Sequence, residues 1–289
     1  MKKKKWLVAI AVVLLLLGGL IHHGSRHVST GPAEGVAIHQ AAQGQATETP
    51  QDRPTLRIAT FNIHAGKGRD GRRDLDRVAD CLGGLDFVAL NEVRGPQTFE
   101  NCDQAERLGR QLGMAWLFTP AVRTWYHLES GNGLLSRVPV TFWQRIPLAR
   151  QYDRSHRNAV LLGLKHRDRT IHVLLTHVNR RYDAERRAQL RAVIALYLAL
   201  AEPAILLGDM NSDTEDPQIR QLLQTPGVSD PVSAMLGLEA IRQQAPQRID
   251  WIFARGLDCV DAGIIDTGAS DHPMIWAELR LPPDARPEP

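Results

Sequence analysis

Cysteine is scarce in this 289-residue chain, which contains only Cys81, Cys102 and Cys259. Three widely spaced cysteines are too few for a structural zinc site or a framework of disulfides. One disulfide, Cys81–Cys102, is a hypothesis that requires an oxidising compartment. The fold must therefore depend on an apolar core, and the roughly 235 residues that follow the first fifty are enough to bury one.

An excess of positive charge is also missing from the globular part. The formal net charge is +3, and Lys2–Lys5 contribute four positive charges, so the rest of the chain carries −1. Bulk charge therefore does not predict a nucleic-acid-binding protein. Arginine-rich segments at 69–77, 154–169 and 180–191 are either a local basic patch or the solvated faces of helices and turns.

One long apolar run is present, at the N-terminus, where Trp6–Ile21 follows Lys2–Lys5. Lysines before an apolar segment direct a chain to a membrane and remain in the cytoplasm. The run spans about 24 Å as a helix, short of the ~30 Å hydrocarbon core, so it fits a short signal anchor or the core of a signal peptide. No small-x-small cleavage site follows directly, which favours an uncleaved anchor over residues 1–23.

Both alternatives place the rest of the chain outside the cytoplasm. We expect a membrane-anchored protein with its domain in the periplasm or extracellular space, or a secreted one if the segment is cleaved. Residues 24–54 are rich in small and polar residues and lack an apolar period, which predicts a flexible linker. Residues 55–282 are expected to form one monomeric domain, followed by a tail at 283–289.

The domain combines many short apolar strands with few helices. Helical signals occur after Asp74 to about Leu82, at Asp103–Leu112 and Asp183–Leu200, and near Pro217–Leu223. This composition predicts an α/β sandwich of two packed sheets with helices outside. The expected strands are Leu56–Phe61, Asp86–Leu90, Ala115–Phe118, Gly133–Ser136, Val140–Arg145, Asn158–Leu164, Thr170–Thr176, Pro203–Leu207, Arg248–Phe253, Cys259–Ile265 and Met274–Leu279.

Several of these strands end in polar residues of chemical use. After Ile205–Leu207, Asp209 and Asn211 point the same way if strand geometry persists. A carboxylate accepts a proton or orients a water, and a carboxamide holds an oxyanion without adding charge. Each such ending, taken by itself, is also typical of a turn or of a buried polar group with ordinary partners. The other endings are Asn62, Glu92, His177, Asp250, and Asp271 with His272.

The order and spacing of these motifs resemble the endonuclease/exonuclease/phosphatase superfamily. The resemblance covers residues 55–280, and its most specific pieces are Gly208-Asp209-Met210-Asn211 and Ser270-Asp271-His272. It implies the DNase I-like fold, a four-layer α/β sandwich in which two mixed sheets are flanked by helices. Residues 62–86 look especially like bacterial members of unassigned substrate. The remaining motifs are Thr60-Phe61-Asn62, Leu90-Asn91-Glu92, Gly131–Arg137, Thr176-His177 and Ile249-Asp250-Trp251-Ile252.

The resemblance implies a metal-dependent phosphodiester hydrolase. Glu92 matches the main divalent-metal ligand, with Asn62 and Asp271 beside it. Hard oxygen ligands suit Mg²⁺ or Mn²⁺, which would neutralise phosphate charge and polarise the P–O bond. Arg157 resembles a phosphate-contacting arginine and is a candidate substrate-binding residue.

The resemblance also assigns catalytic roles. His272 matches the histidine at the scissile phosphate, and Asp250 matches its carboxylate partner. Asp209 matches the residue that aligns or activates the attacking water. Asn211 matches a donor to a phosphate oxygen, and His177 matches a second histidine that assists the leaving group in the nuclease and phosphodiesterase branches.

Three departures from the family pattern are present, and three alternatives for the function remain. Asn91 precedes the metal-binding Glu where Gln is common, Trp251 stands where many members have Tyr, and His64 replaces an Asp of repair-type members, which weakens a repair-endonuclease interpretation. We expect an extracytoplasmic endonuclease first, because two histidines suit a diester. The alternatives are a phosphodiesterase or phosphatase of phospholipid, sphingomyelin or phosphoinositide headgroups, and a non-catalytic binding domain on the same fold.

Overall fold

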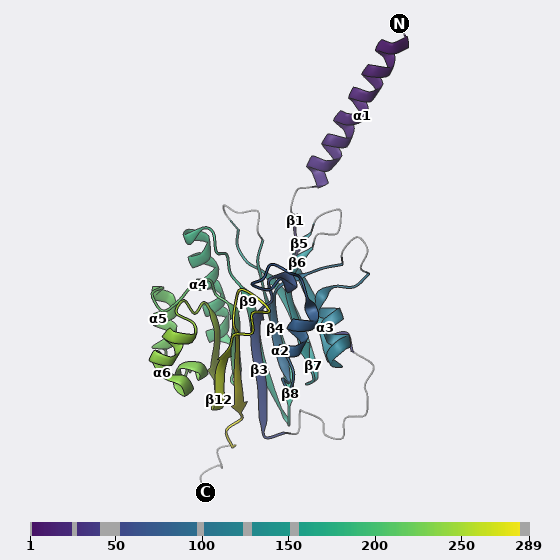
Figure 1. Ribbon diagram of the computed structural model, residues 1–289. Coiled ribbons are helices and arrows are strands. Elements are labelled where there is room, and N and C mark those ends of the chain that lie inside the picture. The colour runs from purple at the N-terminus through teal and green to yellow at the C-terminus, as the bar shows by residue number, and fades with distance from the viewer. Residues whose placement is uncertain are drawn as a thin grey trace.

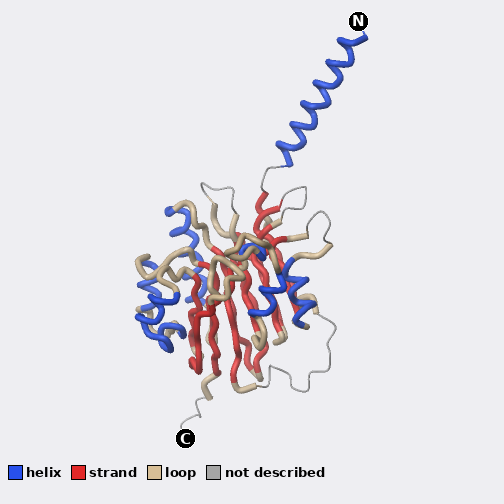
Figure 2. The backbone as a smooth tube through the Cα atoms, viewed as in Figure 1, coloured by secondary structure: helices blue, strands red, loops and turns tan. Residues whose placement is uncertain are grey.

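The computed structural model describes residues 2–24, 28–40, 53–96, 101–123, 129–150 and 156–283. In these residues two mixed β-sheets pack face to face and helices cover their outer surfaces (Figures 1 and 2). The predicted four-layer α/β sandwich is confirmed.

The two sheets share one core of fully buried aliphatic side chains between them. Alternate residues of each strand face this core, and the opposite residues face the outer helices. Within the described residues, the first sheet has seven strands in the order β1 (Val28–Ser29), β5 (Ala115–Arg123), β6 (Ser130–Ser136), β4 (Phe87–Arg94), β3 (Thr55–Asn62), β13 (Met274–Arg280) and β12 (Asp258–Ile265). The second, counted over the same residues, has six in the order β11 (Asp250–Arg255), β10 (Ala204–Asp209), β9 (Arg169–His177), β8 (Asn158–His166), β7 (Val140–Pro147) and β2 (Ala33–Gly35).

The four helices expected from the sequence are present. α2 (Leu75–Cys81) and α3 (Gln104–Leu112) pack on the first sheet. The side chains of Asp74 and Asp103 accept hydrogen bonds from the backbone N–H groups of their first turns, as expected of N-caps. α4 (Asp183–Ala199) and α5 (Pro217–Leu223) cover the second sheet.

A further helix, α6 (Pro231–Gln244), has no counterpart in the sequence-based expectation. Its start carries ordinary signals, because Asp230 caps it and Pro231 occupies the first turn. Gly237, with φ of 75°, interrupts the helical backbone, and a glycine inside a segment weakens a helical prediction from sequence. Val232 and Ile241 nevertheless join the core between the sheets.

Residues 28–40, which we call the strap, differ from the expected flexible linker. Val28–Ser29 pair with the edge strand β5, and Ala33–Gly35 pair with β7 of the other sheet. His39 then forms a backbone bridge with Trp116 and stacks on its ring. An exposed sheet edge pairs through backbone groups and needs no apolar side-chain pattern, so composition did not indicate this docking.

The cysteine hypothesis is wrong for this structure. Cys81 is a free thiol on α2. Its Sγ lies 3.0 Å from the Arg77 carbonyl oxygen and 3.1 Å from Thr267 Oγ1. The thiol is thus engaged by polar groups of its own surroundings rather than by Cys102.

The N-terminal apolar run forms α1 (Lys2–Gly24), which extends away from the sandwich (Figure 1). The stretch Lys4–His22 is long and apolar enough to cross a membrane by length and composition, and none of it is buried against the domain. An anchor and a signal sequence both satisfy this test, so the two alternatives stay predictions.

Candidate active site

The site forms where the parallel strand pairs end together. β3 runs parallel to β4, so that Asn62 lies beside Asn91, and β9 runs parallel to β10, so that His177 lies beside Asp209. Asp250 opens β11 on the other side of Asp209. Carboxyl ends of neighbouring parallel strands share one edge, which is why residues far apart in sequence converge here.

Asp209 is held from both sheets. Asn62 Nδ2 donates to Asp209 Oδ2 at 3.0 Å, although 147 positions separate the two residues. The Asn91 side-chain oxygen accepts from the Asp209 backbone N–H at 3.0 Å, and the Asn211 N–H donates to Asp209 Oδ1 at 2.9 Å. With only 1% of its surface exposed, the Asp209 carboxylate has one available orientation.

Three buried asparagines form a chain of amides behind the site. Asn91 Nδ2 donates to Asn132 Oδ1 at 2.8 Å, and Asn132 Nδ2 donates to Asn158 Oδ1 at 2.7 Å. Asn158 in turn donates to the backbone oxygen of Thr119 at 3.2 Å. A fully satisfied buried network rigidifies its surroundings, so this chain fixes the spacing of the two sheets beneath Asp209. The sequence placed Asn91 and Asn132 in motifs but did not indicate that they touch.

His272 and Asp250 pair as expected, at 2.6 Å between Nδ1 and Oδ2. Burial lowers the pKa of the His272 imidazole, but its hydrogen bond to Asp250 and the nearby carboxylates raise it to about 9. His272 is therefore an imidazolium at neutral pH. The pKa of His177 is instead held well below its ordinary value by burial and by the cations Arg157 and His272, so His177 is neutral.

Asp209 lies between these histidines, with His177 Nε2 at 3.5 Å from its Oδ2. Burial and the charge of Asp250 raise the pKa of Asp209 to about 7, against a smaller opposing effect of His272. A carboxylate that titrates near neutrality is suited to take a proton from water.

We expect Asp250→Asn to lower the pKa of His272 from about 9 towards its ordinary value of 6.5, because the charged hydrogen-bond acceptor is removed. A folded-state pKa above the unfolded one means that the imidazolium stabilises the fold fully below pH 6.5 and that this contribution is lost as pH rises through about 9. NMR titration of the His272 ring in metal-free protein measures the pKa, and urea denaturation at pH 6 and pH 10 measures the contribution to stability. Asp258→Asn, at an exposed carboxylate paired with Arg280, is the control; an unchanged His272 pKa in Asp250→Asn contradicts the assignment.

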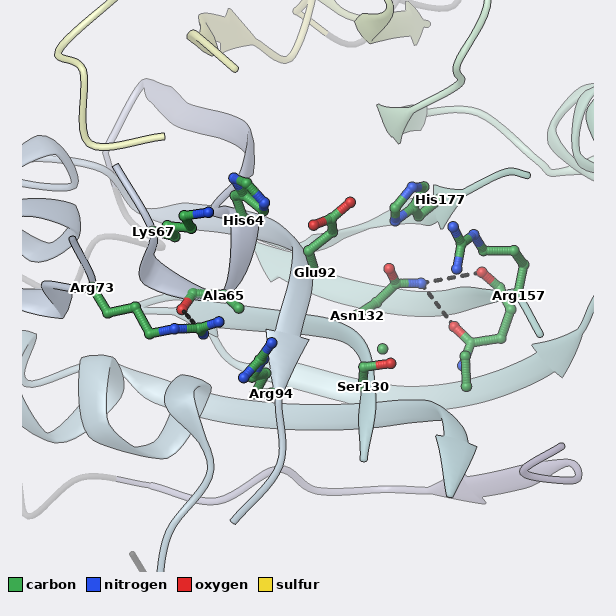
Figure 3. A pocket seen from close by; sticks show the side chains of 13 residues that line it. His64, Ala65, Lys67, Arg73, Glu92, Arg94, Ser130, Asn132, Arg157 and His177 are labelled. Carbon is green, nitrogen blue, oxygen red and sulfur yellow. Dashed lines mark hydrogen bonds between the residues drawn. The ribbon is translucent and has the colours of Figure 1, made fainter. Parts of the chain in front are cut away.

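Glu92 lies beside this group in a cavity of about 320 Å³ (Figure 3). It occupies a bulge of β4 with φ of 57°, a strained conformation that turns its side chain into the cavity. The half-buried carboxylate makes no hydrogen bond or ion pair with other described residues. A half-buried carboxylate without such a partner fits a ligand for a hard divalent cation.

The cavity around Glu92 is otherwise basic. Figure 3 shows Lys67, Arg73 and Arg94 on one side of Glu92 and Arg157 on the other. Burial and the neighbouring charge of Arg73 lower the pKa of Arg94. Four cations around one acidic side chain make a site for an anion. Sequence reasoning named Arg157 and an arginine-rich segment at 69–77, but it did not single out Lys67 or Arg94.

Ser270 links the other two predicted metal ligands, Asn62 and Asp271. Its Oγ is 2.6 Å from the Asn62 backbone oxygen and 3.2 Å from Asp271 Oδ1. Asp271 is half-exposed and also pairs with His64 Nδ1 at 3.2 Å. His64, seen in the sequence only as a departure, is thus part of the site.

Asn211 and Arg157 border the site with their polar groups directed at one carbonyl. Asn211 Nδ2 donates to the Val178 oxygen at 3.0 Å, and its φ of 46° is strained. Arg157 Nε approaches the same oxygen at 3.5 Å.

Asp209, Asp250 and His272 also place one ligand atom each within 4.8 Å of one another. In that group the single His272 imidazolium offsets part of the charge of the two carboxylates, and its Nδ1 is already hydrogen-bonded to Asp250. The Glu92 carboxylate makes no hydrogen bond or ion pair with other described residues, and we therefore regard it as the better cation ligand.

A sequence profile of the Endonuclease/Exonuclease/phosphatase family matches residues 59–272, nearly the whole sandwich. The chain belongs to this family. Members of the family are metal-dependent phosphoesterases. No curated protein matches the sequence significantly.

Solved structures share the fold at low sequence identity. An endonuclease/exonuclease/phosphatase from Beutenbergia cavernae has a TM-score of 0.63 at 23% identity, covering 79% of this chain and 72% of its own. The human Nocturnin catalytic domain with bound sulfate reaches 0.61 at 15% identity, covering 82% of this chain and all of its own (100%). D. rerio TDP2 in complex with a single-strand DNA product reaches 0.60 at 19% identity, covering 79% and 100%. At these identities the likeness concerns the fold alone.

Proposed function

We propose that this chain is a phosphodiester hydrolase that uses water as the nucleophile and a divalent cation, Mg²⁺ or Mn²⁺, bound at Glu92. The observation that carries the proposal is geometric: buried Asp209 lies 3.5 Å from His177 and within 4.8 Å of the hydrogen-bonded Asp250–His272 pair, beside a basic cavity that contains Glu92. Asn62 and Asp271 complete the oxygen ligands. The cation supplies charge neutralisation and polarisation of the phosphate when it is bound.

The protein side chains divide the remaining work. Asp209 accepts a proton from the attacking water, and its hydrogen bond from Asn62 fixes its direction. The His272 imidazolium binds the scissile phosphate and gives its proton to the departing oxygen, with Asp250 orienting the ring. His177, for which the resemblance implied a role at the leaving group, is neutral and instead offers an N–H to a phosphate oxygen, and Asn211 and Arg157 contact the same group.

A metal test follows directly. Glu92→Gln keeps the size of the side chain but removes its charge, so we expect loss of Mg²⁺ or Mn²⁺ binding by calorimetry and a fall of about 10³-fold or more in hydrolysis of bis(p-nitrophenyl) phosphate. Chelation of the wild-type protein should have the same effect, reversed by adding the metal back.

Glu239→Gln, on the surface of α6, is the matched control and should bind metal normally. Full hydrolysis in chelator, with circular dichroism unchanged, contradicts the proposal. Metal binding that survives Glu92→Gln but is lost in Asp250→Asn moves the cation to the Asp209, Asp250 and His272 group.

Two substrate classes fit the basic cavity. A nucleic-acid strand supplies a row of phosphates, and an extracytoplasmic endonuclease would show hydrolysis that falls steeply with salt. A lipid headgroup supplies one phosphodiester at a surface, and the docked strap favours this second candidate. A non-catalytic domain is disfavoured by the intact set of Asp209, Asp250 and His272. We further propose that the protein is a monomer anchored by α1, with its domain outside the cytoplasm.

A further inference from the structure

The first residues of the strap, 28–30, lie beside the cavity. Val28 pairs with Arg123 and Ser29 with Val122, and the Thr30 N–H donates to the Ala121 oxygen at 3.1 Å. Ala121 itself lines the cavity, together with Ser130 and Gly131 of the neighbouring strand. The point at which the chain enters the domain is thus one strand away from the basic cavity.

The strap is bound along its length and does not behave as a loose tether. Arg145 Nε donates to the Gly31 oxygen at 2.8 Å, and Trp143 Nε1 donates to the Ala37 oxygen at 3.1 Å. The strap contacts β5 of one sheet and β7 of the other, so it joins both edges of the sandwich. The position of the domain is therefore set by the position of Val28, the first residue of the strap.

Only three residues separate the end of α1 at Gly24 from Val28. Four peptide steps reach at most about 14 Å. If the apolar run Trp6–Ile21 occupies the hydrocarbon core, Gly24 lies in the interfacial layer, and Val28 cannot lie far above it. Figure 1 shows α1 leaving the domain at the end where β1, β5 and β6 meet.

We propose that the strap holds the basic cavity against the bilayer surface and that the substrate is the phosphodiester of a lipid headgroup. This inference rests on the proposed hydrolase function and on α1 acting as an anchor. The lining cations Lys67, Arg73, Arg94 and Arg157 receive the headgroup phosphate. A water oxygen bonds to phosphorus and one P–O ester bond breaks; Asp209 takes the water proton and the departing alcohol oxygen takes the proton of His272.

The position of the strap allows a matched pair of insertions. A 20-residue proline-rich spacer between Gly24 and Val28 lifts the cavity by about 60 Å. The same spacer between Gln43 and Gly44 follows the strap and leaves the cavity where it was. In full-length protein reconstituted into phosphatidylcholine–phosphatidylglycerol vesicles, we expect the first insertion to lower headgroup hydrolysis at least about tenfold and the second to leave it unchanged.

Soluble bis(p-nitrophenyl) phosphate separates this inference from the proposed function. All three proteins should hydrolyse it equally, and if none does, the hydrolase proposal fails. Equal headgroup hydrolysis by both insertion proteins, or equal loss in both, overturns the membrane inference. Cleavage of plasmid DNA with no release of headgroup or phosphorylated headgroup also overturns it, in favour of an endonuclease.

A distance measurement tests the geometry without catalysis. A fluorophore on Ser130→Cys, in protein whose native cysteines are serines, reports the cavity rim, which is exposed there. Arg280→Cys reports the opposite end, since an eight-residue strand separates the ends by about 26 Å. We expect energy transfer to labelled lipid headgroups to be several-fold stronger from Ser130→Cys and to fall with the spacer before the strap; equal transfer from both positions overturns the inference.

Discussion

Replacing Asp209 with asparagine is expected to lower kcat for phosphodiester hydrolysis by about 10³-fold, with KM changed little. The substitution keeps the shape of the side chain, and its remaining oxygen can still accept from Asn62 or from the Asn211 N–H. What it removes is the group whose pKa, raised to about 7 by burial and by Asp250, allows it to take a proton near neutrality. A steady-state comparison with bis(p-nitrophenyl) phosphate measures the loss.

Glu215→Gln is the control for that substitution. Glu215 lies six residues further along the chain, its side chain is 87% exposed, and it forms a surface ion pair with Arg220. We expect unchanged kcat and stability. An Asp209→Asn protein that keeps more than about a tenth of wild-type kcat contradicts the assignment of Asp209 as proton acceptor.

The largest effect on stability is expected at Gly208, the residue before Asp209. Its φ is +136°, and a Cβ added there would lie 1.9 Å from the Thr176 backbone oxygen. Thr176 is the register partner of Gly208 in the parallel pair of β10 and β9, so neither strand can yield without breaking the ladder that places His177 beside Asp209. We expect Gly208→Ala to lower the free energy of unfolding by about 4 kcal/mol or more.

Urea denaturation measures this change, and Gly83→Ala is its control. A Cβ added at Gly83 would meet no neighbouring atom within 4 Å, and the φ of this residue is not positive. Its substitution should change the free energy of unfolding by less than about 1 kcal/mol. A Gly208→Ala protein that is as stable as the control contradicts the close approach of the β9 backbone to Gly208 of β10.

Local signals predicted most of the framework, because they act within a few residues. Asp74 and Asp103 are capping residues that indicate the start of a helix, and short apolar runs indicate the strands. The helix α6 was not predicted, because a glycine inside a segment weakens the local helical signal, and in the structure Gly237 does interrupt the helical backbone. The disulfide hypothesis was wrong because a sequence does not give the distance between two cysteines. In the structure the Cys81 thiol contacts Thr267 instead.

The chemical identity of the site was determined by the sequence itself: polar residues at strand ends, in an order that marks the family, with Asp209 and His272 among them. Only the tertiary structure decided their state and their surroundings. The pKa of Asp209 is raised by burial and by the charge of Asp250, 41 positions away, and the pKa of His272 is raised by its hydrogen bond to the same Asp250, 22 positions away. Likewise, the strap docks through backbone pairing at two sheet edges, which no side-chain pattern encodes. Contacts of this kind depend on how segments that are distant in the sequence pack together. Local sequence patterns do not report that packing, so the contacts become visible only in the folded structure.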